Sequence, residues 1–368
     1  MVTTHAKGAP GAESGATGLR RWWAGLTGAR PDQFTYVMAT GIVSTAMHNT
    51  GADQLSLILF WLAVAGYAGL VVGVLAGTGP RALLEQTRTR RFGTLAFTAA
   101  GGVLAARLAA MGQTAWALAL IIVSTVSWVL LEYTVIPGIL LGLTRGETPG
   151  LQRVDGTWFL WVVATQSIAV SSGAYAHETG NAGMATFATI CWGIGILQLV
   201  IVAVLVGARL LLIPLQPDDE VSPYWVFMGS GAISVLAAAE VLATGTEQAV
   251  MSEAVVGAVA MAVWSFGTWL VPMLILLTVW QTMRPGGIRR YRTALWAMVF
   301  PIGMYGESTR QLGHIRGTGW LVDVGLAESW VALAVWAVVA LAMLVAFARW
   351  ASAEPVAAAP AAGPAAAP

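Results

Sequence analysis

The sequence predicts an all-α integral membrane protein with ten transmembrane helices arranged as five hairpin repeats. The first observation is composition: of 368 residues, 57% are hydrophobic and 10% are charged, whereas a soluble domain carries about a quarter charged residues. The second is a series of long apolar segments, and the third is the regular recurrence of segments rich in Gly and Ser. This composition excludes a soluble globular enzyme, a disordered chain and a nucleic-acid-binding protein.

The apolar segments are long enough to cross a bilayer, which takes roughly 20 residues of helix. Backbone polar groups in lipid must be satisfied within the segment, so these segments are expected to be helices. The ten predicted spans cover residues 34–50, 54–77, 92–110, 113–143, 157–173, 183–214, 223–243, 250–282, 292–312 and 325–349. They form one permease domain, residues 31–350, between a cytoplasmic leader, 1–30, and a low-complexity Ala/Pro tail, 351–368.

The basic residues predict how the chain is oriented. Of 19 Lys and Arg residues, 16 lie before the first span or at and after the ends of the even-numbered spans. The positive-inside rule then places both termini in the cytoplasm of a multi-pass plasma-membrane protein. This agrees with an even number of spans, which independently places both termini on the same side of the membrane. The leader has no apolar core, so it is not expected to be a cleaved signal peptide.

Odd- and even-numbered spans differ in composition. The even spans are rich in Leu, Val and Ala, whereas the odd spans are shorter and rich in small residues. The small-residue centres lie near Gly41, Gly102, Ser167, Gly231 and Pro301, at intervals of 61, 65, 64 and 70 residues. Parallel repeats are related by an axis along the membrane normal, so odd helices are expected to form an inner ring inside the even ones. If so, the inner ring encloses a central path. The alternative is a solid bundle in which the small residues only allow close helix packing.

Three stretches in odd spans resemble a known family. FTYVMATGIVS in the first span, GTWFLWVVATQSIAV in the fifth and ALWAMVFPIGMY in the ninth resemble the tellurite-resistance/dicarboxylate transporter family. That family includes slow anion channels, malate permeases and sulfite efflux pumps. The resemblance covers about residues 30–350 and implies five helical hairpins around a central pore, commonly in a homotrimer. It also implies transport of small anions, namely C4-dicarboxylate, sulfite, chloride or nitrate.

The resemblance also implies a gate. In the family, a phenylalanine before the proline of the ninth span closes the pore, and Phe300 stands before Pro301 at that position. The alternative is an aromatic side chain packed in the bundle core. The chain departs from the family in the fifth span, where Trp161 replaces a frequent proline, which puts pore width in question.

Polar and small residues of the odd spans are candidates to replace the hydration that an anion loses in the pore. The predicted lining residues are Thr40, Gly41, Ser44, Gly101, Gly102, Gln166, Ser167, Ser171, Ser230, Gly231, Pro301 and Met304. For each polar member of this set, the alternative is a hydrogen bond to a neighbouring helix.

Ionisable residues within spans are functional candidates by default. Arg107 and Arg310 lie near the outer ends of their spans, where either could attract anions to the mouth. The alternative for Arg310 is an i, i+3 ion pair with Glu307. Glu132 and Glu240 are candidate proton-linked sites or, alternatively, carboxyl groups that are hydrogen-bonded between helices.

The predicted function is an anion channel or permease, and the alternative is a proton-coupled carrier of a dicarboxylate or sulfite. No cofactor or metal is expected, because the sequence has one cysteine, four scattered histidines and no nucleotide-binding motif. An intramembrane enzyme is a weaker alternative, since it would have to depend on His48 with Asp53 or His177 with Glu178 in short loops.

Overall fold

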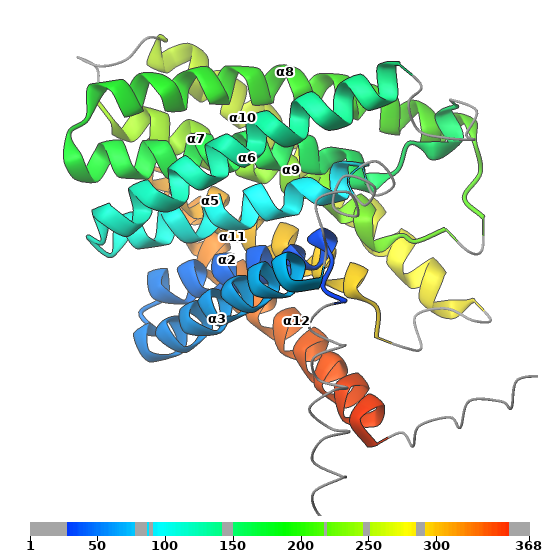
Figure 1. Cartoon of the computed structure of the whole chain (residues 1–368). Helices are drawn as coiled ribbons and strands as arrows, with labels where there is room; N and C mark the ends of the chain where they lie inside the picture. The colour runs from blue at the N-terminus through cyan, green and yellow to red at the C-terminus, as the bar shows by residue number, and fades with distance from the viewer. Residues whose placement is uncertain are drawn as a thin grey trace, which may run out of the picture.

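The computed structural model describes residues 28–77, 87, 91–141, 150–216, 219–245, 251–284 and 291–352. Most of the predicted leader and tail lies outside these residues. The described part contains these long α-helices: α2 (Thr35–Asn49), α3 (Asp53–Gly77), α5 (Ala96–Ala110), α6 (Thr114–Leu140), α7 (Phe159–Thr179), α8 (Ala182–Leu212), α9 (Trp225–Ala243), α10 (Glu253–Met283), α11 (Trp296–Arg316) and α12 (Gly319–Ser352). The described residues contain no β-strand, which confirms the predicted all-α class. The end of α12 extends beyond its neighbours (Figure 1).

Eight of these helices are long and apolar enough to cross a membrane. The two that do not qualify are α2, which ends in the polar residues His48 and Asn49, and α11, which carries Glu307, Arg310 and Arg316. The membrane fold is therefore confirmed, while the count of ten crossings stays a prediction.

The helices form two layers. Five helices contact one another in the closed order α2, α5, α7, α9, α11 and back to α2. Within the crossing segments, 83% of the residues are buried for α5, α7 and α9, but only 11–39% for α3, α6, α8, α10 and α12. Each outer helix packs on the inner helix that precedes it in the chain. Lipid therefore contacts mainly the outer layer.

Small residues allow the inner helices to approach closely. A Cβ atom added to Gly102 of α5 would lie 2.7 Å from the Ser167 Oγ of α7, and one added to Gly41 of α2 would lie 2.8 Å from Cγ1 of Val103. These separations are too short for real side chains. Gly41 and Gly102, two of the glycines predicted to line a pore, thus make contacts that hold the ring together.

Each inner helix begins in the same way. A 3₁₀ turn precedes all five: η1 (Pro31–Phe34), η2 (Arg91–Leu95), η4 (Gly156–Trp158), η5 (Ser222–Tyr224) and η7 (Thr293–Leu295). Consecutive turns contact one another in chain order. The recurrence of one local structure at one end of each inner helix supports an internal repeat.

Outer helices also reach forward to the next inner helix. Indole Nε1 groups donate from Trp128 of α6 to Thr165 Oγ1 of α7, from Trp264 of α10 to Thr309 Oγ1 of α11, and from Trp336 of α12 to Thr40 Oγ1 of α2, at 2.8–3.0 Å. Trp192 of α8 likewise donates to the Ser234 backbone oxygen of α9 at 3.0 Å. The bond from α12 to α2 joins the last hairpin to the first, so bonds of this kind connect four of the five pairs of neighbouring hairpins.

We predict that Gly102→Ala destabilises the folded protein, because the new methyl group overlaps Ser167. Overpacking of this kind costs about 1–3 kcal/mol, which a lower melting temperature in detergent would report. Gly207→Ala on outer helix α8 is the matched control, since nothing lies within 4 Å of its added Cβ. Equal melting temperatures for the two variants would contradict the prediction.

Candidate functional site

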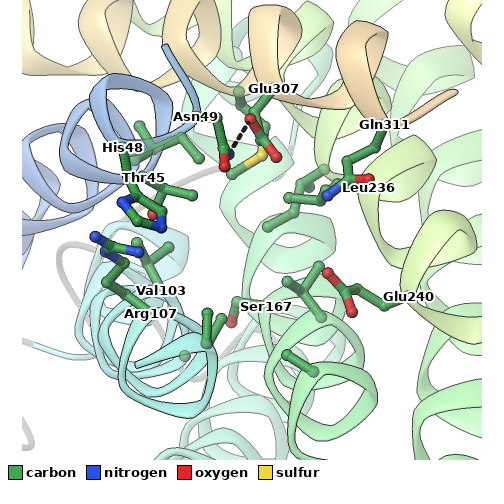
Figure 2. A pocket seen from close by; sticks show the side chains of 18 of the residues that line it. Thr45, His48, Asn49, Val103, Arg107, Ser167, Leu236, Glu240, Glu307 and Gln311 are labelled. Atoms are coloured by element: carbon green, nitrogen blue, oxygen red, sulfur yellow. Dashed lines mark hydrogen bonds between the residues drawn. The ribbon is translucent and has the colours of Figure 1, made fainter. Parts of the chain in front are cut away.

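A cavity of about 140 Å³ lies between the C-terminal halves of the five inner helices. We call it the vestibule (Figure 2). Each inner helix contributes one residue to its deep end: these are Ile42, Gly102, Ser167, Ile233 and Met304. A second cavity of about 260 Å³ shares Ala110, Ala174, Glu240 and Gln311 with it. The two cavities together make a passage toward the end of the ring where the inner helices finish.

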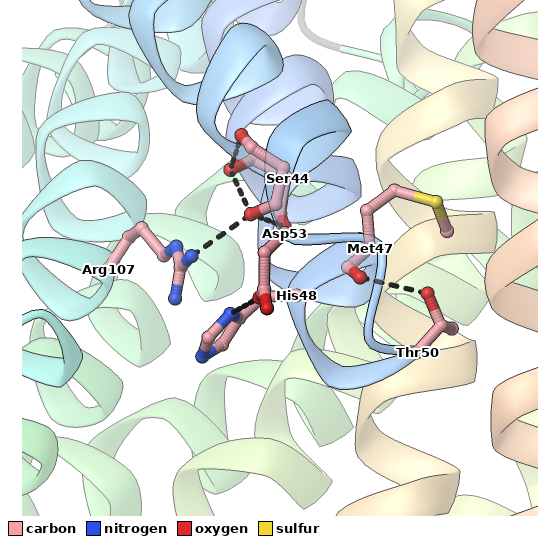
Figure 3. Close-up of polar contacts among 7 residues, drawn as sticks. Ser44, Met47, His48, Thr50, Asp53 and Arg107 are labelled. Carbon is pink, nitrogen blue, oxygen red and sulfur yellow. Dashed lines mark hydrogen bonds and ion pairs between the residues drawn. The ribbon is translucent and has the colours of Figure 1, made fainter.

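Arg107 is a buried basic residue of the vestibule wall. Its residue surface is only 3% exposed, and its Nη2 donates to Ser56 Oγ at 3.0 Å (Figure 3). Nε has no hydrogen-bond partner, and no carboxylate among the described residues pairs with this guanidinium. Because a guanidinium carries five N–H donors, Arg107 keeps donors and a positive charge for a ligand.

Arg310, the other predicted mouth residue, is already paired. Its Nη2 donates to Glu307 Oε1 at 2.7 Å and its Nε to Glu307 Oε2 at 3.0 Å. The Asn49 side chain donates to the same carboxylate at 2.9 Å. The structure therefore shows the i, i+3 ion pair that was the alternative for Arg310, and it leaves Arg107 as the mouth residue without a carboxylate partner.

His48 stands beside Arg107 on the vestibule wall (Figures 2 and 3). Its Nδ1 lies 2.7 Å from Asp53 Oδ1. This carboxylate orients the ring, and the imidazole faces the cavity from the end of α2. Asp53 and His48 thus form a local pair close to the guanidinium, rather than a cluster of catalytic groups.

The two predicted proton-linked carboxyl groups occupy different places. Glu240 lines both cavities, and no hydrogen bond or ion pair joins its carboxyl group to another described residue. Glu132 instead lies between α6, α7 and α8, where it accepts from Trp128 Nε1 at 2.5 Å, Thr165 Oγ1 at 3.0 Å and Gln198 Nε2 at 3.4 Å. Glu132 therefore has the interhelical role that was its alternative, and only Glu240 faces the passage.

Three of the predicted lining residues line the vestibule: Gly102, Ser167 and Met304. Several others point to neighbouring helices instead. Thr40 accepts from Trp336, Ser44 donates to the Ser56 backbone oxygen at 2.8 Å, and Gln166 donates to the Trp192 backbone oxygen at 3.3 Å. The two hydroxyl groups and the Gln166 Nε2 are thus bonded to neighbouring helices, which is the alternative stated for these residues.

The remaining predicted lining residues also lie outside the vestibule wall. Added Cβ atoms on Gly101 and Gly231 would meet outer-helix residues, Ser124 and Val263. Gly41 contacts α5, and the Pro301 ring lies against Gly229 of α9. Ser171 and Ser230 donate within their own helices, to the backbone oxygens of Ile168 at 3.2 Å and Phe227 at 2.8 Å.

Phe300 is buried, with 1% of its surface exposed. It lies one helical turn before Met304 on α11, and thus one turn beyond the deep end of the vestibule. Its role as the gate stays a prediction.

The sequence reasoning missed Thr45, His48, Asn49 and Gln311, which all line the vestibule. A signal was present in the spacing of the lining residues. On α7 they are Ser167, Val170 and Ala174, and on α9 they are Ile233, Leu236 and Glu240. Both sets follow the i, i+3, i+7 spacing of one helix face, and Ile42, Thr45 and Asn49 repeat it on α2.

Comparisons with known proteins agree with this architecture. The profile of the voltage-dependent anion channel family matches residues 29–344, which confirms the resemblance drawn from the three sequence stretches. Two relatives from Mycobacterium tuberculosis are the uncharacterized membrane proteins MT1776 (strain CDC 1551) and Rv1735c (strain H37Rv). Each is 41% identical over 146 residues, which is 39% of this chain and 74% of the relative.

We predict that Glu307→Gln destabilises the protein by about 3 kcal/mol, because it leaves a largely buried guanidinium without its carboxylate. Glu307→Gln combined with Arg310→Gln should recover part of that loss. A double-mutant cycle of detergent unfolding measures the coupling, and strictly additive effects would contradict it.

Proposed function

The chain belongs to the voltage-dependent anion channel family, and we propose that it is a channel or permease that moves small anions along the axis of its inner ring. The observation that carries this proposal is Arg107, a buried guanidinium without a carboxylate partner among the described residues. It faces a cavity to which all five inner helices contribute. A charge in such a place is expensive to bury, and an anion in the vestibule would offset that cost.

In this proposal α2 and α11 cross the membrane although they fail the test of length and hydropathy. Outer helices separate them from lipid, so they need not be apolar on every face. Five hairpins then give ten crossings with both termini in the cytoplasm of a plasma-membrane protein. The vestibule opens on the opposite side. Family resemblance supports a homotrimer with one pore per protomer.

Phe300 is the proposed gate of this path. The vestibule ends at the level of Met304, and the next turn of α11 presents a fully buried aromatic ring. A hydrophobic constriction of this kind stops ions because they cannot keep their hydration there. The substrates are chloride, nitrate, sulfite or a C4-dicarboxylate, and transport involves no covalent chemistry, so the protein is not an enzyme.

A proton-coupled carrier is the second candidate, and the position of Glu240 favours it. This carboxyl group borders both cavities and has no partner among the described residues. It could therefore exchange a proton with solvent as an anion passes, whereas Glu132 accepts from three donors, two of them on neighbouring helices.

Flux through proteoliposomes tests the gate and the two candidates. We predict that the wild-type protein passes little chloride, nitrate, sulfite or malate, and that Phe300→Ala passes small anions at least about tenfold faster without a proton gradient, because the constriction is removed. If wild type moves an anion only with a proton gradient, and Phe300→Ala releases no passive flux, the protein is a coupled carrier and Phe300 is not the gate.

We predict that Arg107→Gln lowers anion flux in the Phe300→Ala background by about tenfold or more, because it removes the charge that attracts the anion. Arg107→Lys should retain part of the flux. Arg316→Gln is the control, since Arg316 is exposed at the same end of α11 and does not line the vestibule. Undiminished flux in Arg107→Gln would show that the guanidinium plays no part in permeation.

A further inference from the structure

The two cavities meet at Glu240. Its side chain lines both of them, together with Ala110, Ala174 and Gln311. Figure 2 shows the carboxyl group on the wall opposite Arg107 and His48. An ion that passes between the cavities therefore passes a carboxylate before or after it reaches the guanidinium.

The small residues around Glu240 hold it at this junction. A Cβ atom added to Gly173 of α7 would lie 2.7 Å from the Glu240 Cβ, so the stem of the side chain packs directly on the neighbouring inner helix. Ala174 and Ala110 complete that part of the wall without supplying a side-chain donor. The carboxyl group thus faces the passage rather than a protein partner.

Two ionisable side chains of the vestibule wall have no ion-pair partner among the described residues. Glu307 pairs with Arg310 and the His48 ring contacts Asp53, whereas Arg107 and Glu240, which carry opposite charges when ionised, have no such partner. A monovalent anion beside Arg107 is matched by that single positive charge. A divalent anion brings a second negative charge, which at the junction of the two cavities faces Glu240, with Glu178 farther along the second cavity. Repulsion between like charges is strong where little water screens it.

We propose that Glu240 sets the valence selectivity of the passage, so that monovalent anions cross it in preference to divalent anions of the same size and shape. This inference rests on the proposed function. It assigns Glu240 to selectivity through the negative charge of its ionised carboxylate.

Perchlorate and sulfate test this directly, because both are tetrahedral oxyanions and differ by one charge. Their fluxes are measured in proteoliposomes for the wild type and for Glu240→Gln, each also in the Phe300→Ala background so that a closed gate does not hide the result. We expect the perchlorate-to-sulfate flux ratio to fall by about tenfold in Glu240→Gln. The two ions differ in hydration, but that difference is common to both proteins and cancels in the comparison.

Three further variants make the result specific. Glu240→Asp should keep the wild-type ratio, and Glu253→Gln, which neutralises an exposed carboxylate at the start of α10, should not change it. Gln311→Glu adds a carboxylate at the same junction and should raise the ratio, which tests the idea even if Glu240→Gln does not fold.

The outcomes distinguish failure of the selectivity role of Glu240 from failure of the proposed anion permease function. If perchlorate crosses and the perchlorate-to-sulfate flux ratio in Glu240→Gln and Gln311→Glu equals that of the parent protein, the selectivity role of Glu240 is overturned. The proposal of an anion permease is then unaffected. If neither anion, nor chloride or nitrate, crosses through any folded variant, the proposed function itself fails.

Discussion

The close approach of the five inner helices is the constraint on which the rest of the structure depends. Gly102 leaves no room for a side chain beside Ser167, and Gly41 leaves none beside Val103. In a membrane, helices associate through such packing because lipid offers little hydrophobic driving force. A ring this tight can enclose only a narrow cavity, so whatever passes through it must lose most of its water.

The ring also decides where polar groups are tolerated. Inner helices are shielded from lipid, so α11 can carry an ion pair and α2 can carry Thr40, His48 and Asn49. The lipid-exposed layer then supplies the donors for the buried hydroxyls, as Trp336 does for Thr40 and Trp264 does for Thr309. The hydropathy test accordingly passes every outer helix, and the two helices that it rejects, α2 and α11, both belong to the inner ring.

The sequence predicted the helices, their alternation in composition and the close packing of their small residues. It did not predict which face of each inner helix lines the cavity. A helix inside a ring is buried on all sides, so the small-residue centres mark contacts with neighbours as well as the lumen. Gly101 and Gly102 are adjacent in sequence, yet one faces α6 and the other lines the vestibule.

The two glutamates make the same point. Glu132 and Glu240 give similar signals, each a single carboxylate in an apolar segment, but the first belongs to an even-numbered span and the second to an odd one. Glu132 therefore lies on an outer helix, where it accepts a hydrogen bond from a neighbouring helix. Glu240 lies on an inner helix, where it lines the passage. Only the contacts between helices, which no single segment encodes, turn the difference into distinct chemical roles.

The contrast between the two vestibule arginines connects folding to function. Arg310 has a carboxylate on its own helix, whereas α5 carries no acidic residue for Arg107. Ser56 of α3 supplies one acceptor and no charge, so the guanidinium is stabilised less by the protein than it would be by a bound anion. If an anion does bind there, Ser56 keeps one of the donors occupied, and Glu240 faces the same space. Both features weaken the hold on the anion, and conduction requires a site that an ion can enter and also leave.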